Sequence, residues 1–464
     1  MPKHFYKPLC HLVLLAGILL IHVPAMAAPE KIFNAEHYTL ENGLEIVVIP
    51  SARVPAITHM VWYKTGAADE PRGKSGIAHF LEHLMFKGSE GFGPGDFSEK
   101  IRALGGNDNA FTSQDYTAYF ESIASEHLET VMTMEAGRMR GLNPLMEEVL
   151  SERDVILEER RQRTDNDPGA KLSEQLDAAT FVNHPYGTPV IGWAHEMASL
   201  SWADAKNFYD HWYGPNNAIL IVSGDVTGAQ VYELAKKIYG PLPRVDVPKR
   251  HWISSPPANG EVHVTLYDES VRQPTVETQF RTPSHNQNKD EALALEVLAE
   301  IMGGGPSSRL YKSLVIEQKL AASAGMSYSP ERVSDATLTL YAIPLPGIEP
   351  AAVEEAYKNV LRTLIADGID AQELIDAKTR MQDAAIYARD SLAGPAMIFG
   401  YALVTGSSID DVEYWPDYIS KIQAEDVLAV AKKYLDPDAN NDRPVVTGYL
   451  LPAPAEDKQQ EDAQ

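Results

Sequence analysis

The 464-residue chain is acidic, with 65 Asp and Glu residues against 40 Lys and Arg residues and a formal net charge of −25 at pH 7. An acidic surface does not favour nucleic acid or an anionic membrane as a partner. It suits basic or neutral peptides, and it equally suits a surface that simply resists aggregation. The length predicts two or more domains.

The first 27 residues have the features of a secretory signal peptide. Two lysines precede a mostly apolar run over residues 9–23, and an Ala-Met-Ala sequence predicts cleavage after Ala27. The run is too short and too interrupted for a membrane span, and no later stretch reaches spanning length. The single cysteine, Cys10, lies in this segment, so the mature chain has none and carries a net charge of −27. We expect a periplasmic protein, with an extracellular location as the alternative.

Strand and helix patterns alternate after this segment. Residues 38–50 predict a β-hairpin, because an Asn-Gly pair separates two apolar runs. Further strand and helix patterns follow in chain order, and the last two predict helices that are rich in paired charges. The predicted ranges are 56–63 for a strand, 97–104 for a helix, 109–122 for strand structure around a turn, and 128–139 and 146–163 for the two helices.

One combination of elements occurs twice, about 222 residues apart. A helix with an acidic first turn, a proline-containing turn and a buried strand occupy residues 199–224 and again 422–448. The repetition predicts two homologous halves, although chance similarity of such common units is the alternative. The predicted parts are a domain over 35–242, a proline-rich linker over 243–260, a second domain over 261–452, and a disordered acidic tail over 453–464.

The motif with the clearest chemical meaning is His79-Phe80-Leu81-Glu82-His83, which reads H-x-x-E-H. On a helix, His79 and His83 share one face and can point two imidazoles at one metal ion. Glu82 lies beside them, where its carboxylate can hold and deprotonate a metal-bound water. The pattern is the inverzincin signature. A pair of surface histidines on an amphipathic helix is the alternative.

A catalytic zinc needs a third protein ligand and an open position for water. The acidic helix over residues 151–161 is the obvious source. Glu152 and Glu159 are two turns apart and therefore share a face, whereas Glu158 is rotated by about 100° from Glu159. A solvated charged helix is the alternative interpretation of this stretch.

The run from Ser75 to Gly88 around the motif resembles, almost residue for residue, the zinc-binding helix of the pitrilysin and mitochondrial processing peptidase family. The resemblance covers residues 35–452. It implies an α+β fold of two homologous halves packed side by side, each an antiparallel sheet backed by helices. Our own prediction of strands followed by helical pairs agrees with that layered arrangement.

The resemblance also implies roles for particular residues. One zinc ion per chain would be held by His79, His83 and Glu159, with Glu82 as the catalytic base. Glu152 matches the family glutamate that supports the metal ligands from two turns upstream. The implied activity is zinc-dependent hydrolysis of peptides or small unfolded proteins.

Residues 105–117 resemble the active-site edge strand of the family, to which a substrate backbone adds as a further strand. Asn109 matches the asparagine that helps to hold the substrate near the metal, with Ala110 beside it. An ordinary turn and strand is the alternative.

The second half departs from the family pattern. Members that work alone carry an arginine and a tyrosine seven residues apart that stabilise the oxyanion. Here those positions hold Val315 and Ala322. The chain therefore resembles the zinc-bearing, beta-type subunit of a bacterial two-subunit member, and we expect a hetero-oligomer with a paralogue that supplies the arginine and tyrosine. A non-catalytic assembly subunit of the same fold is the alternative. A metal-storage or zinc-sensing protein fits poorly, because binding alone does not need Glu82.

Overall fold

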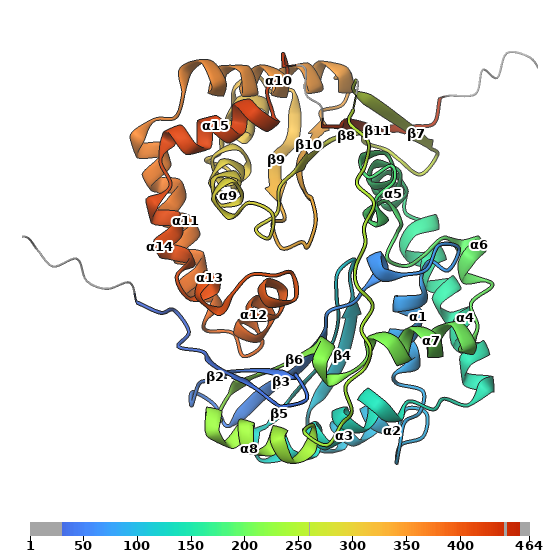
Figure 1. The fold of residues 1–464 in the computed structure, drawn as a ribbon. Coiled ribbons are helices and arrows are strands. Elements are labelled where there is room, and N and C mark those ends of the chain that lie inside the picture. Colours follow the sequence, from blue (N-terminus) through green and yellow to red (C-terminus); the bar gives the residue numbers. More distant parts are fainter. Residues whose placement is uncertain (1–29, 259, 440–442, 455–464) are drawn as a thin grey trace, which may run out of the picture.

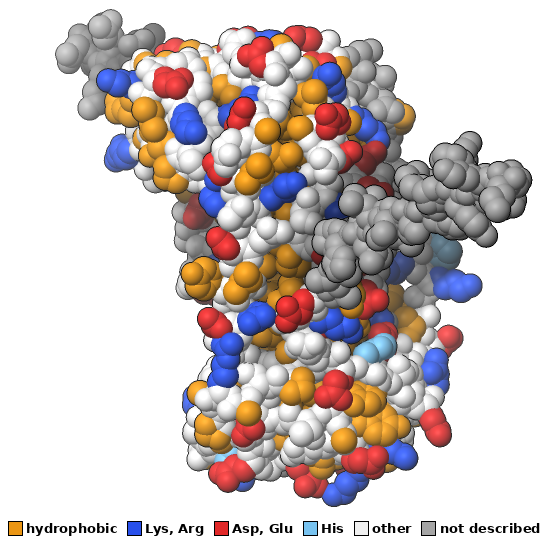
Figure 2. Space-filling model, turned by 90° about the vertical axis from the view of Figure 1, so that its left-hand side faces the viewer, with side chains coloured by type: hydrophobic (Ala, Val, Ile, Leu, Met, Phe, Trp, Pro, Cys, Tyr) orange, Lys and Arg blue, Asp and Glu red, His pale blue; other side chains and the backbone are white. Residues whose placement is uncertain are grey.

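The computed structural model describes residues 30–258, 260–439 and 443–454, and it forms two lobes, each built on one β-sheet with helices against it (Figure 1). This arrangement confirms the predicted α+β fold of two similar halves. Seen from the side, the lobes stack one above the other, with acidic and basic side chains interspersed on both (Figure 2).

Several predictions concern the ends of the chain and the domain limits. The predicted signal peptide and residues 455–464 of the predicted tail lie outside the described residues. The exact domain limits remain predictions. Within the described residues, no helix combines the length and the apolar character that crossing a bilayer requires.

The first sheet has six strands. The predicted hairpin forms its edge, and Gly43 in the turn has a φ of +93°, a left-handed conformation that favours glycine. The predicted strand over 56–63 is present, and the predicted segment over 109–122 forms two antiparallel strands. Across the sheet the strands are β1 (Glu36–Thr39), β2 (Glu45–Pro50), β6 (Ala218–Gly224), β3 (Ala56–Tyr63), β5 (Thr117–Ala124) and β4 (Asn107–Thr112).

The second sheet repeats this topology without a counterpart of β1. Its strands in chain order take the same places as the last five strands of the first sheet, so that β9 is the edge strand that corresponds to β4. Across the sheet they are β7 (Val262–Asp268), β11 (Val445–Pro452), β8 (Thr275–Thr282), β10 (Ala336–Pro344) and β9 (Ala321–Tyr328).

Each sheet departs from the expected antiparallel pairing at one position. β2 and β6 are parallel, as are β7 and β11, whereas the other neighbouring pairs are antiparallel. The cause is that the last strand of each half inserts between two earlier strands of that half. β6 lies between β2 and β3, and β11 lies between β7 and β8. A strand inserted antiparallel to one neighbour must be parallel to the other, because those two neighbours are themselves antiparallel.

Helices cover the sheets, and the predicted repeat is confirmed. α7 and β6 correspond to α15 and β11, and both helices begin with a capping box, closed by Asp204 in the first copy and Asp426 in the second. The helices of the first half are α1 (Ile77–Leu84), α2 (Asp96–Ala103), α3 (Leu128–Gly141), α4 (Met146–Arg160), α5 (Pro168–Thr180), α6 (Ala194–Met197), α7 (Trp202–Trp212) and α8 (Gly228–Ile238). Those of the second half are α9 (Lys289–Gly303), α10 (Pro350–Asp367), α11 (Ala371–Ala388), α12 (Gly394–Val404), α13 (Ile409–Glu413), α14 (Trp415–Lys421) and α15 (Ala424–Tyr434).

Each half contributes one helix that packs against the sheet of the other half. α5 belongs to the first half but lies against the second sheet, where Leu172 and Leu176 pack with Leu450 (Figure 1). α12 belongs to the second half but lies against the first sheet, where Phe399 packs in one apolar cluster with Trp62. Burial of these side chains therefore depends on both halves being in place.

The turn between β4 and β5 is held from several directions. The Asp115 carboxylate accepts hydrogen bonds from the Tyr186 hydroxyl at 2.8 Å and from the Val333 backbone of the second half at 3.2 Å. Arg250, in the segment that joins the halves, donates to the Asp115 carbonyl at 2.8 Å and to Asp69 at 2.7 Å. The second half and the linker thus fix the hairpin that contains β4.

Candidate metal centre

The short helix α1 begins with a turn that only glycine fits. Gly76 has a φ of +87°, and a Cβ there would lie 2.6 Å from the Ile191 carbonyl oxygen. The half-buried Glu70 carboxylate accepts hydrogen bonds from the backbone N–H groups of Gly76 and Ala78, each at 2.9 Å. A carboxylate at a helix N-terminus is favourable because the helix dipole is positive there. These contacts fix where α1 starts and hence where its histidines point.

α1 and α4 bring three predicted donors together. His79 and His83 lie four residues apart on α1, with ring centroids 4.7 Å apart. Both Nε2 atoms face the Oε2 atom of Glu159 on α4, at 3.5 Å from His79 and 3.4 Å from His83. The structure therefore assembles the predicted ligand set, and the role of these residues as ligands stays a prediction.

The donor set fits a zinc ion. Bonds of about 2.1 Å at tetrahedral angles separate donor atoms by about 3.4 Å, which agrees with the distances to Glu159. Within the described residues, the Oε2 atom of Glu159 is buried and has no hydrogen-bond partner. A bound cation would satisfy that atom.

Burial and neighbouring charges shift the pKa values of the three predicted ligands in different directions. Burial lowers the pKa of His79 to about 4, and the neighbouring His83 lowers it further. Burial also lowers the pKa of His83, but its contacts with Glu152 and Glu159 outweigh that effect and raise the pKa to about 9. The contact with His83 lowers the pKa of Glu159 to about 2. Glu159 therefore presents a full negative charge at neutral pH.

Glu152 contacts His83 at Nδ1, the ring nitrogen that does not face Glu159. Its Oε1 atom lies 2.7 Å from Nδ1 of His83, and its Oε2 atom lies 2.7 Å from the ammonium group of Lys87. A carboxylate in this position selects the tautomer that leaves Nε2 of His83 free for a metal. This geometry is the one expected for the supporting role predicted for Glu152.

Glu82 precedes His83 on α1, and its carboxylate contacts the edge strand β4. Its Oε2 atom accepts a hydrogen bond from the Thr112 hydroxyl at 2.6 Å, and burial raises its pKa. Thr112 is the last residue of β4, and sequence reasoning did not single it out. The signal was available, because Thr112 lies in the same short string as Asn109, but its contact with Glu82 depends on the fold.

The structure places β4 at the edge of the first sheet, as the resemblance implied, and packs it against α1. Asn109 is exposed, and its Oδ1 atom accepts a hydrogen bond from the Ala110 backbone at 2.9 Å. A free strand edge beside three convergent donors is a geometry that can accept an extended peptide. Substrate binding by Asn109 and Ala110 stays a prediction.

The two departures from the family pattern lie at the corresponding edge of the second half. Val315 is in a π-helical turn (Tyr311–Glu317), and Ala322 is exposed on β9. Neither side chain can donate a hydrogen bond. These two positions therefore cannot supply the oxyanion contacts that the family arginine and tyrosine provide.

Comparison with known proteins gives consistent matches over most of the chain. The protein-family model "Insulinase (Peptidase family M16)" matches residues 46–193, and "Peptidase M16 inactive domain" matches residues 199–381. The chain is 31% identical over 437 residues to the zinc protease PqqE of Helicobacter pylori, which covers 93% of this chain and 97% of that protein. It is 30% identical over 408 residues to an uncharacterized zinc protease of Mycobacterium leprae, covering 86% of this chain and 88% of that protein.

Solved structures give the same result. The crystal structure of a protease from Helicobacter pylori matches with a TM-score of 0.83 and 30% identity, over 92% of this chain and all of that one. The first half of the periplasmic protease PqqL from Escherichia coli matches with a TM-score of 0.76 over 92% of this chain and 93% of that one. At 21% identity, the second likeness concerns the fold alone.

Proposed function

Because the chain belongs to peptidase family M16, we propose that it is the zinc-bearing subunit of an endopeptidase that hydrolyses peptides or small unfolded proteins. One observation carries the proposal. The Nε2 atoms of His79 and His83 lie 3.5 and 3.4 Å from one carboxylate oxygen of Glu159, at the separation that tetrahedral zinc ligands adopt.

The residues around the proposed zinc position have separate roles in the reaction. A zinc ion held by the three donors would polarise the scissile carbonyl and lower the pKa of a water molecule. Glu82 takes a proton from the attacking water and later passes it to the leaving amine. Its hydrogen bond with Thr112 fixes the carboxylate, and burial raises its pKa and so makes it a stronger base. Glu152 holds the ring of His83 in place.

The substrate backbone would pair with the free edge of β4. Asn109 would release the Ala110 N–H group that it now contacts and hold the incoming peptide instead. Main-chain pairing places few demands on side chains, which suits an enzyme for varied peptides. We place this activity in the periplasm, because of the predicted signal peptide.

A second subunit completes the proposed site. Val315 and Ala322 leave the chain without the oxyanion donors that single-chain members have, so we propose a paralogous subunit that supplies an arginine and a tyrosine. A non-catalytic assembly subunit is the competing function, and these same two positions favour it.

The test is hydrolysis of a quenched fluorescent peptide library by the purified mature chain, with and without the paralogue, alongside measured zinc content. We expect about one zinc per chain, activity only with the partner, and loss of activity in Glu82→Gln with zinc retained. Activity of the chain alone would contradict the divided site. Bound zinc without activity in either preparation would favour the assembly subunit.

A further inference from the structure

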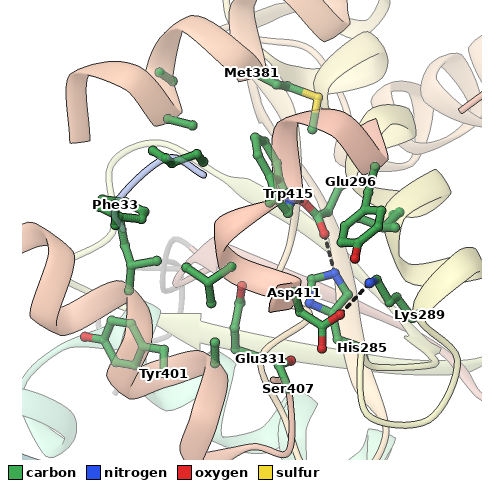
Figure 3. A pocket seen from close by; sticks show the side chains of 18 of the residues that line it. Phe33, His285, Lys289, Glu296, Glu331, Met381, Tyr401, Ser407, Asp411 and Trp415 are labelled. Carbon is green, nitrogen blue, oxygen red and sulfur yellow. Dashed lines mark hydrogen bonds and ion pairs between the residues drawn. The ribbon is translucent and has the colours of Figure 1, made fainter. Parts of the chain in front are cut away.

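The second half contains an open-sided cavity of about 710 Å³ between α9 and α11, which residues of α12, α13 and α14 also line. Figure 3 shows its lining side chains. By order of elements, α9 and α11 correspond to α1 and α4 of the first half. The cavity therefore occupies, in the second half, the place that the metal centre occupies in the first. No role in the proposed peptidase reaction uses it.

The walls of the cavity are largely apolar and aromatic. Phe33, Met381, Tyr401 and Trp415 approach it from different elements (Figure 3). The indole N–H of Trp415 is already satisfied, because it donates to Glu296 at 3.0 Å. These walls can bury an aromatic or aliphatic body of drug-like size.

Two carboxylates of the lining are neutralised by the chain's own cations. Glu300 accepts from the Arg380 guanidinium at 2.6 Å. Asp411 pairs with the Lys289 ammonium group. These pairs add no net charge to the cavity.

Within the described residues, the other two carboxylates of the lining form no ion pair with a lysine or an arginine. Glu296 contacts Nε2 of His285 at 2.5 Å. Within the described residues, the Glu331 carboxylate has no ion pair and no side-chain hydrogen bond, and it points toward the space that Phe33, Tyr401 and Trp415 enclose (Figure 3). The lining thus carries one excess negative charge when His285 is protonated and two when it is neutral.

We propose that this cavity binds an organic cation, an ammonium or guanidinium group on an apolar or aromatic body, with Glu331 as the counter-charge. Glu331 is exposed, and the carboxylate of Glu296 lies near it, so a bound cation would reduce the repulsion between these two negative charges.

A metal ion is not the occupant that the geometry supports. Within the described residues, the groups of His, Asp and Glu donors that converge closely enough for a metal do not include His285, Glu296 or Glu331. The convergent group outside the proposed metal centre contains Glu354, and Lys358 already lies 2.8 Å from that carboxylate. An organic cation needs only one carboxylate and an apolar wall.

The test uses the mature full-length chain and two probes of equal shape, 4-phenylbutylamine and 4-phenylbutanol, followed by calorimetry. We expect saturable binding of the amine at least about 10-fold tighter than that of the alcohol, which is the size of one charge-assisted contact. Glu331→Gln should weaken the amine at least about 10-fold and leave the alcohol unchanged. Glu126→Gln, the same change on an exposed residue of the first half, should have no effect.

Two results would overturn the proposal: equal affinity for amine and alcohol, or unchanged amine affinity in Glu331→Gln. Ala385→Phe, which fills the cavity from α11, gives a second check, because it should abolish binding of both probes while the variant keeps its helical circular dichroism. Retained binding in that variant would place the amine elsewhere.

The same cation can come from a free amine or from a basic side chain in a polypeptide. Competition with acetyl-Phe-Arg-Phe-amide separates these sources. Displacement of the amine by the peptide assigns the cavity to polypeptide chains, and binding of the amine without displacement assigns it to free amines. The site does not depend on the metal centre, so loss of peptidase activity would leave this result unaffected.

Discussion

The two halves of the molecule share a topology but use the gap between two corresponding helices differently. In the first half, α1 and α4 direct His79, His83 and Glu159 at one point, while Arg163 pairs with the other carboxylate oxygen of Glu159 at 2.9 Å. In the second half, α9 and α11 border a cavity in which Lys289 and Arg380 neutralise two of the carboxylates. The backbone thus provides the location, and the side chains that converge there decide what each location can bind.

The largest expected effect comes from removing the charge of the third donor. Glu159→Gln keeps the side-chain volume but replaces a carboxylate with an amide, so zinc affinity should fall by more than about 1,000-fold and peptidase activity with the partner should disappear. Zinc affinity is measured by competition with a chromogenic chelator, and activity with a quenched fluorescent peptide.

Glu158→Gln is the matched control for this variant. Glu158 is the preceding residue of α4, is exposed, and contacts Arg161 instead of the histidines. It should retain zinc and activity. Equal losses in both variants, or zinc retained by Glu159→Gln, would remove α4 from the metal centre.

The exchanged helices test whether the halves depend on each other for stability. Phe399 of α12 is fully buried against the first sheet, and Leu176 of α5 is fully buried against the second. Phe399→Ala should lower the free energy of unfolding by about 3–5 kcal/mol and Leu176→Ala by about 2–5 kcal/mol, because each leaves a cavity.

Urea unfolding followed by circular dichroism measures both changes. Tyr387→Ala provides the control, since that side chain on α11 is 74% exposed and its loss should change stability by less than about 0.5 kcal/mol. A cost below 1 kcal/mol for either core variant would mean that its helix does not hold the opposite sheet.

Local spacing explains which parts of this architecture the sequence could predict. The four-residue interval of His79 and His83 and the seven-residue interval of Glu152 and Glu159 are properties of single helices, so they could be predicted before the helices were placed. The duplicated helix–turn–strand unit also predicted two halves correctly. The contact of Thr112 with Glu82 depends on where β4 lies relative to α1, and no spacing along the chain encodes it.

Long-range choices account for what the sequence did not predict. An apolar strand such as β6 does not indicate between which neighbours it inserts, so the parallel pair in each sheet was not anticipated. An amphipathic helix indicates that one face is buried but not which sheet buries it, and the exchange of α5 and α12 followed only from the structure. The cavity in the second half arises from five separate helices and four connecting segments, which share no sequence motif.

A smaller loss of zinc affinity is expected when Glu152, the residue that orients His83, is changed. Glu152→Gln weakens the contact that orients His83, so zinc affinity should fall by about 10- to 100-fold without abolishing binding. Glu147→Gln, an exposed change near the start of the same helix, should leave zinc affinity unchanged. Chelator competition measures both. Identical affinities for the two variants would limit Glu152 to its ion pair with Lys87.

The smallest effect is a pH dependence confined to the second half. Burial lowers the pKa of His285, but its contact with Glu296, aided by Glu331 and Asp411, outweighs burial and raises the pKa above 6.5. The charged form is therefore favoured by folding, and its contribution is fully present below pH 6.5 and is lost as pH rises through the folded pKa. We expect about 1 kcal/mol, the size of a partly exposed charged hydrogen bond.

Urea unfolding of the wild-type chain and of His285→Gln at pH 6, 7, 8 and 9 tests this dependence. Glutamine can still donate to Glu296 but does not titrate, so the difference in unfolding free energy between the two proteins should shrink by about 1 kcal/mol as pH rises. Parallel pH profiles would mean that folding does not shift the pKa of His285, so that His285 loses its charge near pH 6.5. Above that pH the cavity lining would hold two excess negative charges in place of one, which strengthens the expected preference for a cationic ligand.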